Sequence, residues 1–415
     1  MISEMKKNWE VKTLSELTTL LGDGLHGTPK YTDDGEYYFV NGNNLVNGKI
    51  IFKDNTKRVS VDEYTKYKKN LTDRTVLVSI NGTLGNVAFY NNEKVMLGKS
   101  ACYFNLLDTV DKKYIKYIIS SQYFLDYVHR EATGATIKNV SLKTMRAFKV
   151  PIPPIPEQKR IVSLLDTVFA DLEQTRAKTE QNLKNARELF DSYLQLVFNQ
   201  LGENCTIRSM SDKSMLSMID GDRGKNYPKK SEFQSEGHCL FLSTKNVRPD
   251  GFLFDQTMFI DESRDSLLRK GKLERNDVVV TTRGTIGNLA LFDESIEYNN
   301  IRINSGMLIL RPNIETILPS YLFEIMRSGI VRKQIDEKVS GAAQPQLPVN
   351  TLNTFSFPVP VSLEEQKHTV DLIRKAELEI NELTNIYTRK LNAIDELKKS
   401  ILQKAFSGEL TAEAK

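Results

Sequence analysis

Few residues of this 415-residue chain combine the types and the spacing that covalent chemistry requires. Gly98-Lys99-Ser100 resembles the end of a phosphate-binding loop, but Glu93 stands where that motif requires its first glycine. The sequence has no Rossmann-type glycine cluster, and it has no Asn-Pro-Pro-aromatic or Asp-Pro-Pro-Tyr motif of a methyl-transferring enzyme. We therefore expect no catalytic residue and no cofactor site in this chain.

The potential metal ligands and thiols are scattered. The four histidines lack the short intervals of a metal site, at His26, His129, His238 and His368. The three cysteines match neither a disulfide framework nor a zinc site, at Cys102, Cys205 and Cys239. We expect no metal site, and we expect reduced cysteines that serve as packing residues.

Two Glu-x-Lys pairs match the tail of a nuclease motif. Glu157 and Lys159 form the first pair, and Glu365 and Lys367 form the second. Both pairs stand at expected helix starts without an upstream Pro-Asp partner, and the helix dipole stabilises a carboxylate there. Helix capping therefore explains the pairs better than a self-sufficient nuclease, which we keep as an alternative.

The residues that remain as candidates are basic, amide and tyrosine side chains in two sets of loops. The first set is Lys30, Tyr31, Asn43, Asn44, Lys57 and Arg58, and the second is Arg223, Lys225, Lys229, Lys245, Asn246, Arg248 and Arg283. In the major groove of DNA, Arg or Lys suits guanine and Asn suits adenine. The same side chains can instead contact phosphate, which positions the protein without reading sequence. These sets predict binding of double-stranded DNA.

The distribution of charge agrees with a polyanionic partner. The chain has a formal net charge of +4, with 22 Lys and Arg against 16 Asp and Glu in residues 1–150, and 20 against 19 in residues 206–357. Residues 151–205 have 6 against 8, and residues 358–415 have 9 against 10. Positive charge therefore concentrates outside the segments that we expect to be helical, where a polyanion would bind. A merely solvated lysine-rich surface is the alternative.

Two long helices organise the chain. PIPPIPEQKR from Pro151 leads into residues 157–201, which contain no glycine or proline, and Gly202 supplies a stop. PVPVSLEEQK from Pro358 repeats this start, and Ser362 begins an S-x-x-E capping box for a second helix that ends at Gly408. Apolar residues at steps of three and four give each helix one stripe, with a polar centre in the first helix at 175–179. Matching residues near the far ends of the helices suggest that they pack on each other, with Leu189, Leu194 and Phe198 repeated as Leu397, Leu402 and Phe406.

The remaining segments predict two similar domains of mixed α/β class. Residues 1–150 contain strand patterns at 37–40, 49–52, 75–80 and 86–90, followed by a helix at about 111–131. Residues 206–357 repeat the plan with strands at 240–242, 278–282, 288–292 and 307–311, and a helix at about 319–338. Because each domain runs into its own helix, and the second domain also follows the first helix, the helices must be antiparallel. The predicted fold is α/β (α+β), with a pseudo-two-fold internal repeat.

A five-residue glycine turn occurs once in each domain. Gly82-Thr83-Leu84-Gly85-Asn86 reappears as GTIGN at 284–288. The glycines could hold a phosphate, but a tight connection between strands that needs positive φ is the commoner reason. Neighbouring loops differ between the copies, as in DGLHGTPKY at 23–31 and DGDRGKNYP at 220–228. The repeat therefore predicts one task performed on two targets.

These features resemble the specificity subunit of a type I restriction-modification enzyme over nearly the whole chain. The resemblance rests on the two variable domains, the loop TGATIKN at 133–139, the Pro-x-Pro runs that lead into Glu-Gln-Lys, and the glycine turns. It implies target recognition domains at 1–150 and 206–357, each reading one half of a bipartite DNA site. It also implies spacer helix regions at 151–205 and 358–415. The loop SGAAQPQ at 340–346 departs from the first copy, so we carry over no contact at Lys138 or Asn139.

The resemblance further implies partners that supply the chemistry. Two methyltransferase subunits would bring S-adenosylmethionine, and restriction subunits with a motor and nuclease would bring ATP and Mg²⁺. A helix of 45 residues spans about 67 Å, enough to hold two domains a DNA turn or more apart. A purely architectural coiled-coil scaffold could have the same helices and stays open as an alternative. No stretch approaches the length of a membrane span, and we expect a soluble, cytoplasmic protein.

Overall fold

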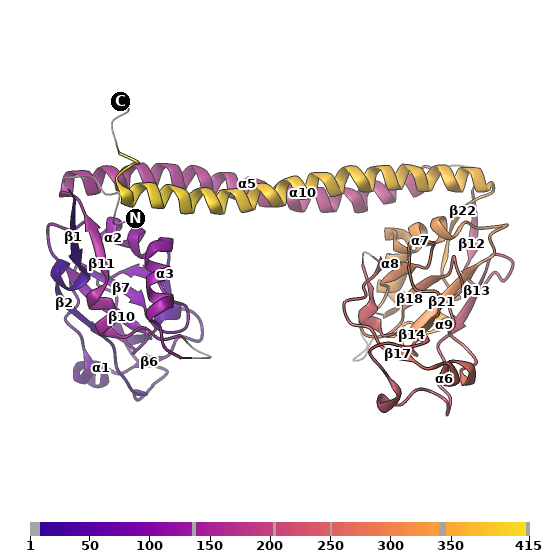
Figure 1. Cartoon of the computed structure of the whole chain (residues 1–415), viewed down its shortest axis with the longest axis horizontal. Helices are drawn as coiled ribbons and strands as arrows, with labels where there is room; N and C mark the ends of the chain where they lie inside the picture. Colours follow the sequence, from indigo (N-terminus) through magenta and orange to yellow (C-terminus); the bar gives the residue numbers. More distant parts are fainter. Residues whose placement is uncertain (1–8, 135–137, 202–204, 250, 340–345, 412–415) are drawn as a thin grey trace. The chain divides into compact units, whose positions relative to one another are not determined.

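The computed structural model describes residues 9–134, 138–201, 205–249, 251–339 and 346–411 (Figure 1). The chain forms two compact units, one comprising Met1–Glu180 with Arg389–Lys415 and the other Gln181–Thr388. Each unit contains one of the predicted globular segments together with parts of both helical segments. No helix in the described parts of the chain combines the length and apolar character that a membrane crossing demands.

The first unit is built on a four-stranded antiparallel sheet in which β10 is paired on both sides. The strand order is β2 (Thr18–Asp23), β10 (Ala101–Leu106), β7 (Thr75–Ser79) and β8 (Val87–Phe89). All residues of β7 and β10 are buried, as expected for paired strands covered on both faces. The first domain thus forms its core around a strand, β10, that the sequence patterns did not predict.

Smaller sheets and short helices complete this unit. The parallel pair β3 (Tyr37–Val40) and β9 (Val95–Leu97) is joined by β6 (Arg58–Val59), and the two-stranded sheets are β4 (Leu45–Val46) with β5 (Lys49–Ile50) and β1 (Glu10–Thr13) with β11 (Lys149–Ile152). The helices are η2 (Leu14–Leu17), η3 (Gly42–Asn44), α1 (Val61–Tyr67), α2 (Lys112–Ile119), α3 (Gln122–Glu131) and α4 (Leu142–Ala147).

The second unit repeats this architecture. Its main sheet has the order β13 (Leu216–Asp220), β21 (Met307–Pro312), β18 (Val278–Thr281) and β19 (Leu289–Leu291). The smaller sheets are β17 (Phe259–Ile260), β14 (Cys239–Leu242) and β20 (Ile301–Ile303), then β12 (Cys205–Ser209) with β22 (Ser356–Pro360), and β15 (Val247–Arg248) with β16 (Gly251–Phe252). The helices are η5 (Lys230–Glu232), η6 (Thr244–Asn246), α6 (Glu262–Leu267), α7 (Pro319–Arg327), α8 (Gly329–Val339) and α9 (Val349–Leu352). The predicted class and internal repeat are confirmed.

The prediction of a single helix in each domain is wrong, because each predicted segment forms two helices. The pattern at 111–131 divides into α2 and α3, and the pattern at 319–338 divides into α7 and α8. The backbone is extended at Ser121 and Ser328, where each hydroxyl donates a 2.6 Å hydrogen bond to the carbonyl three residues earlier. Those bonds replace helical ones, so the chain changes direction without losing its apolar spacing.

The two long helices are confirmed, as α5 (Ile155–Asn199) and α10 (Leu363–Ser407), each of 45 residues. Ser362 Oγ accepts a 3.1 Å hydrogen bond from the Glu365 N–H, as half of the expected capping box. Gly408 ends α10 with a φ of +86°, a conformation that favours glycine. The expected stop at Gly202 lies outside the described residues.

The helices are antiparallel within each unit. In the first unit, Glu173 and Arg176 of α5 pair with Lys398 and Asp395 of α10. In the second unit, apolar residues near the end of α5 and the start of α10 enter the same core, namely Leu194, Val197, Phe198, Val370 and Ile373.

The far-end repeats do not all pack. Phe198 and Phe406 are buried, whereas Leu189 is 54% exposed and Leu397 is 47% exposed. Of the matching far-end residues, the pairs Leu194/Leu402 and Phe198/Phe406 are therefore buried, whereas Leu189 and Leu397 face away from the cores.

Candidate nucleic-acid interface

Four strands of the first unit end at one edge of the domain. Strands β2 and β7 flank the antiparallel β10, with Asp23 opposite Cys102 and Ser79 opposite Ala101, so both end where β10 begins. The parallel strands β3 and β9 also end together, and the segment after β2 bridges to the residue after β9. Loops that follow these strands are therefore neighbours, and we call this edge the strand-end edge.

The glycine turn lies at the strand-end edge, between β7 and β8. Gly82 and Gly85 have φ values of +75° and +81°, and the matching glycines between β18 and β19 have +76° and +84°. The Gly82 N–H donates a 3.0 Å hydrogen bond to the Lys138 carbonyl. The Gly85 N–H donates a hydrogen bond of the same length to the Ser79 carbonyl. Because these amides bond within the domain, the turn is a strand connection rather than a phosphate cradle.

A second loop lies against the glycine turn in both units. Asn81 forms a β-bridge with Asn139, and its Nδ2 donates 3.2 Å to Asn139 Oδ1. In the second unit, Arg283 forms the corresponding bridge with Gln346. Arg283 is among the predicted DNA contacts, whereas Asn81 and Gln346 are not, although their matching places in the internal repeat could have indicated them. Asn139 stands in the loop for which no contact was carried over from the resemblance.

Most of the predicted DNA-contacting residues are exposed. They are Lys30, Tyr31, Asn43, Lys57 and Arg58 in the first unit, and Arg223, Lys225, Lys229, Lys245, Arg248 and Arg283 in the second. Exposure makes these side chains accessible to a ligand, and it leaves their role as a prediction.

Asn44 and Asn246 instead lie inside the protein, with exposed fractions of 5% and 3%. Asn44 Oδ1 accepts from the Asn41 N–H at 3.0 Å, and its Nδ2 donates to the Ile51 carbonyl at 3.0 Å. Asn246 has the same arrangement, accepting from Ser243 N–H and donating to the Leu253 and Gln256 carbonyls. These amides hold the short helices η3 and η6, so we do not retain them as direct DNA contacts.

The predicted residues of the first unit fall into two places. Asn43 lies in η3, directly after β3 at the strand-end edge, whereas Tyr31, Lys57 and Arg58 line a cavity of about 310 Å³ near the start of β3. There the Arg58 guanidinium donates a 2.6 Å hydrogen bond to the Tyr38 hydroxyl, and its central carbon lies 4.6 Å from the centroid of the Tyr38 ring. This second cluster is also lined by acidic residues, Asp33 and Asp54.

The second unit gathers its cations more closely. Arg223 and Arg283 line a cavity of about 240 Å³ together with Gln346, and Arg223 lies 3.0 Å from the Asp220 carboxylate. A neighbouring cavity of about 220 Å³ is lined by Arg223, Arg269 and Lys270. The last two cations, which are exposed, were not among the predicted site residues.

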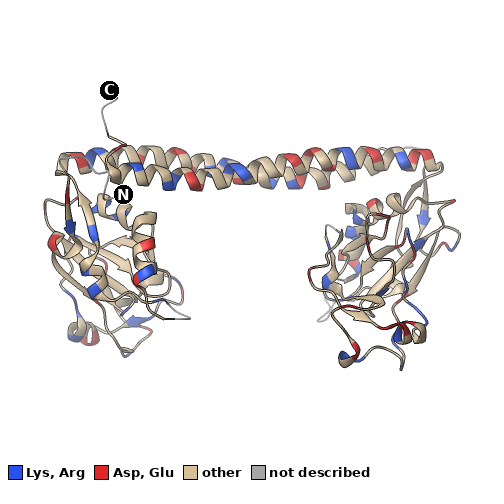
Figure 2. Cartoon of the chain, in the orientation of Figure 1, with Lys and Arg blue, Asp and Glu red and all other residues tan. Residues whose placement is uncertain are grey.

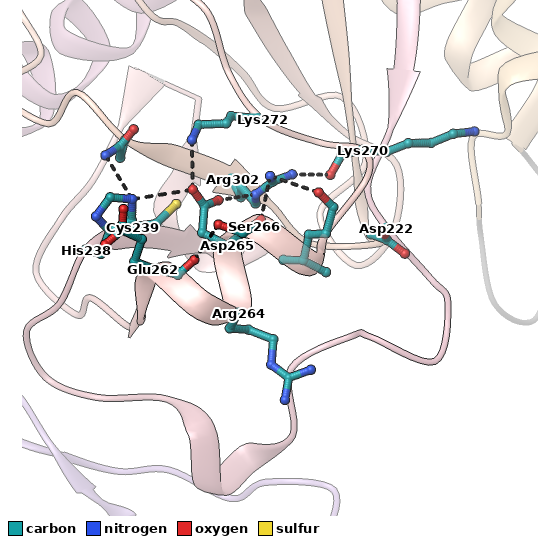
Figure 3. A network of polar contacts seen from close by, with 12 residues as sticks. Asp222, His238, Cys239, Glu262, Arg264, Asp265, Ser266, Lys270, Lys272 and Arg302 are labelled. Atoms are coloured by element: carbon teal, nitrogen blue, oxygen red, sulfur yellow. Dashed lines mark hydrogen bonds and ion pairs between the residues drawn. The ribbon is translucent and has the colours of Figure 1, made fainter.

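A buried polar network in the second unit holds α6 against β20 (Figure 3). The Asp265 carboxylate accepts a 2.5 Å hydrogen bond from Arg302 Nε and a 2.8 Å hydrogen bond from Lys272 Nζ. His238 Nε2 lies 3.5 Å from the same carboxylate. Burial opposes ionisation of Asp265, but the hydrogen bonds from Lys272 and Arg302 outweigh it, so its pKa lies below the ordinary value. The carboxylate and guanidinium satisfy each other, which indicates a structural role.

Cys102 and Cys239 are buried thiols outside any disulfide, as predicted. Burial raises the pKa of the Cys239 thiol to about 12 and also raises that of Cys102. The two thiols therefore stay protonated and inert at neutral pH. Within the described residues, no three His, Cys, Asp or Glu side chains come together in a group that could hold a metal ion.

Comparisons with known proteins agree with the repeated architecture. The family model described as "Type I restriction modification DNA specificity domain" matches residues 6–183 and again residues 218–393. The chain is 22% identical to the StySPI specificity subunit of Salmonella potsdam, covering 99% of this chain and 91% of the relative. It is also 22% identical to the EcoKI specificity subunit of Escherichia coli K12, again over 99% and 91%.

Two solved structures share the fold. The HsdS subunit from Thermoanaerobacter tengcongensis superposes with a TM-score of 0.60 at 16% identity, covering 98% of each chain. A chain from a structural study of the assembly and conformational transition of the type I restriction-modification system gives 0.75 at 16% identity, covering 98% of this chain and 99% of the other. Because the family model matches both halves, this chain belongs to the type I restriction-modification DNA specificity family, as a non-catalytic specificity subunit.

Proposed function

We propose that this specificity subunit binds an asymmetric, bipartite site in double-stranded DNA, with two short specific blocks separated by a fixed unread gap. The observation that carries the proposal is the repeat itself: two units share strands, glycine turns and buried asparagines, but they expose different side chains at equivalent places. Similar scaffolds with different surface chemistry suit two different base sequences. The distance between the blocks stays a prediction from helix length.

We also propose that each unit docks one methyltransferase subunit on its pair of helices. Acidic and basic residues are interleaved along α5 and α10 (Figure 2), and equivalent leucines are exposed on both. The first unit exposes Leu164 and Leu397, and the second exposes their counterparts Leu372 and Leu189. Two matching sets of exposed leucines on helices that also carry interleaved charges suit two copies of one partner.

The partners would supply the chemistry that completes the complex. The methyltransferase subunits would hold S-adenosylmethionine, and restriction subunits would use ATP and Mg²⁺ for translocation and cleavage. The specificity subunit would contribute the DNA target and the positions of its partners on it.

Mapping of methylated sites tests the proposed DNA target. The full chain is assembled with its methyltransferase, incubated with a random DNA library, and the methylated sequences are compared. We expect two specific blocks with a constant gap, and a single continuous block would contradict the proposal.

Exchanging residues 206–357 for those of another family member separates this function from the scaffold alternative. The exchange should change one block and leave the other, whereas a scaffold would leave the methylated target unchanged. DNA cleavage by the purified chain with Mg²⁺ alone would instead establish the nuclease alternative.

A further inference from the structure

Strands β13, β18, β14 and β20 of the second unit end together in the same way, with Asp220 opposite Leu308, Thr281 opposite Met307 and Leu242 beside Ile303, so this unit has its own strand-end edge. Four positions at this edge are equivalent in the two units. The first unit places His26 after β2, Asn43 in η3, and Asn81 after β7 opposite Asn139. The second unit places Arg223 after β13, Lys245 in η6, and Arg283 after β18 opposite Gln346. We call these four pairs the readout positions.

The main chain that carries the readout positions is the same in both units. His26 Nε2 lies 2.6 Å from the Asp23 carboxylate, and Arg223 lies 3.0 Å from Asp220, which occupies the same place at the end of its strand. The buried amides of Asn44 and Asn246 hold the turns that expose Asn43 and Lys245. Asp23 and Asp220 thus hold the side chains three residues later, and the turns at Asn44 and Asn246 hold the main chain of Asn43 and Lys245.

The chemistry at the readout positions differs between the units. The first unit carries three amides and an imidazole, whereas the second carries three cations and one amide. By contrast, Tyr114 and Tyr321 are equivalent tyrosines in the two units. The hydroxyl of each donates a 2.8 Å hydrogen bond to a proline carbonyl, that of Pro151 in β11 or of Pro358 in β22. The readout positions therefore differ in chemistry although the scaffold around them is repeated.

We infer that the readout positions are the specificity-determining residues of this subunit, an inference that rests on the proposed DNA binding. Amides make paired hydrogen bonds to adenine, and guanidinium or ammonium groups bind guanine O6 and N7. The first unit thus reads its half-site chiefly at A·T pairs, and the second unit reads its half-site chiefly at G·C pairs. Asp23 and Asp220 are positioning residues that orient the side chains three residues later.

The test uses the full chain in its methyltransferase complex and compares Arg283→Ala with Asn81→Ala. Arg283→Ala should relax the preference for guanine at one position of one half-site by about 5- to 150-fold, the range for a lost base contact. Asn81→Ala should relax an adenine position in the other half-site by a similar factor. Arg283 is exposed and Asn81 is half-buried, and unchanged thermal unfolding confirms that each variant folds.

Lys68→Ala and Lys230→Ala are matched controls, because both lysines are exposed, lie outside the readout positions and are not among the predicted DNA contacts. Each should leave every base preference unchanged. Uniformly weaker binding by Arg283→Ala, with base preferences intact, would show a phosphate contact and overturn the inference, as would relaxation at an A·T position. A wild-type complex with one continuous block would instead contradict the proposed bipartite function, so the two failures are distinguishable.

Discussion

Two buried glutamines, Gln158 and Gln366, hold the start of each long helix against its own domain. The Gln158 side chain accepts a 2.8 Å hydrogen bond from the Asp111 N–H and donates hydrogen bonds to the Thr109 and Pro153 carbonyls. Gln366 makes the same three bonds, to Leu318 N–H and to the carbonyls of Thr316 and Pro360. The glutamine of the repeated Glu-Gln-Lys motif therefore anchors the start of each long helix to its own domain, and we call its three hydrogen bonds the clasp.

Gln366→Leu should destabilise the second unit by about 3 kcal/mol, because one buried N–H and two carbonyls lose their partner. Gln403→Leu is the control, since Gln403 is an exposed glutamine of the same helix. Urea unfolding of the full chain measures both variants. Equal stability of the two would show that the clasp contributes nothing.

Asp265→Asn should destabilise the chain at pH 7 by about 3–5 kcal/mol, because Arg302 is left as a buried charge without its ionic partner. The lowered pKa of Asp265 means that its contribution is present above the ordinary aspartate pKa of about 3.9 and is lost as the pH falls through the folded value. The difference from wild type should therefore shrink below about pH 3.9.

Glu262→Gln is a matched control for Asp265→Asn, because Glu262 is an exposed carboxylate on the same helix α6. Thermal unfolding at pH 7 and at pH 3 compares the three proteins. A deficit of Asp265→Asn that stays constant between these pH values would contradict the assigned pKa direction.

At the scale of the elements, two pairs of exposed leucines repeat between α5 and α10. Leu164 and Leu372 are 39% and 38% exposed, and Leu189 and Leu397 are 54% and 47% exposed, so each unit has one leucine of each pair. Leucines at these sites add nothing to the core, so partner binding is the use that we propose for them.

Leu164→Asp with Leu397→Asp should remove one of the two bound methyltransferase subunits, because the charges replace exposed leucines of the first unit alone. Native mass spectrometry of the complex counts the subunits. Ser163→Asp with Gln403→Asp, at exposed polar positions of the same helices, should keep both. Two methyltransferase subunits on the leucine variant would refute the docking assignment.

At the scale of the whole molecule, each unit is completed by helical residues far from its domain in sequence. The first core contains Leu402, Ala405 and Phe406, and Phe406 packs edge-on against Tyr114 with ring centroids 5.5 Å apart. The second core uses Phe198 against Tyr321 at 5.8 Å. The end of α5 in the second unit thus has the same role as the end of α10 in the first.

Residues 1–205 expressed alone should form a dimer, because the end of α5 from a second copy can occupy the place of α10 with modest repacking. With the methyltransferase added, the methylated site should become a palindrome of the first half-site. Light scattering measures the mass, and Phe198→Ala should weaken the dimer by removing the aromatic contact. A strictly monomeric fragment that also fails to bind residues 206–415 would contradict this helix packing.

The sequence by itself determined the repeat, the two long helices and their ends, because these depend on local spacing. Proline runs, Ser362 and Gly408 act within a few residues of where they stand, and the structure confirms the last two directly. The same dependence on local spacing made the prediction of one helix at 111–131 wrong, because Ser121 breaks the helix without interrupting the spacing of the apolar residues.

Only the tertiary structure decided which polar residues meet at one edge. Asn43 and Asn44 are adjacent and chemically identical, yet one is exposed and the other is buried, because η3 packs one face against the domain. The strand-end edge forms where β3 pairs with β9, more than fifty residues later, and β2 pairs with β10, about eighty residues later. No local pattern encodes those pairings, since they depend on side chains that are brought together by the whole core.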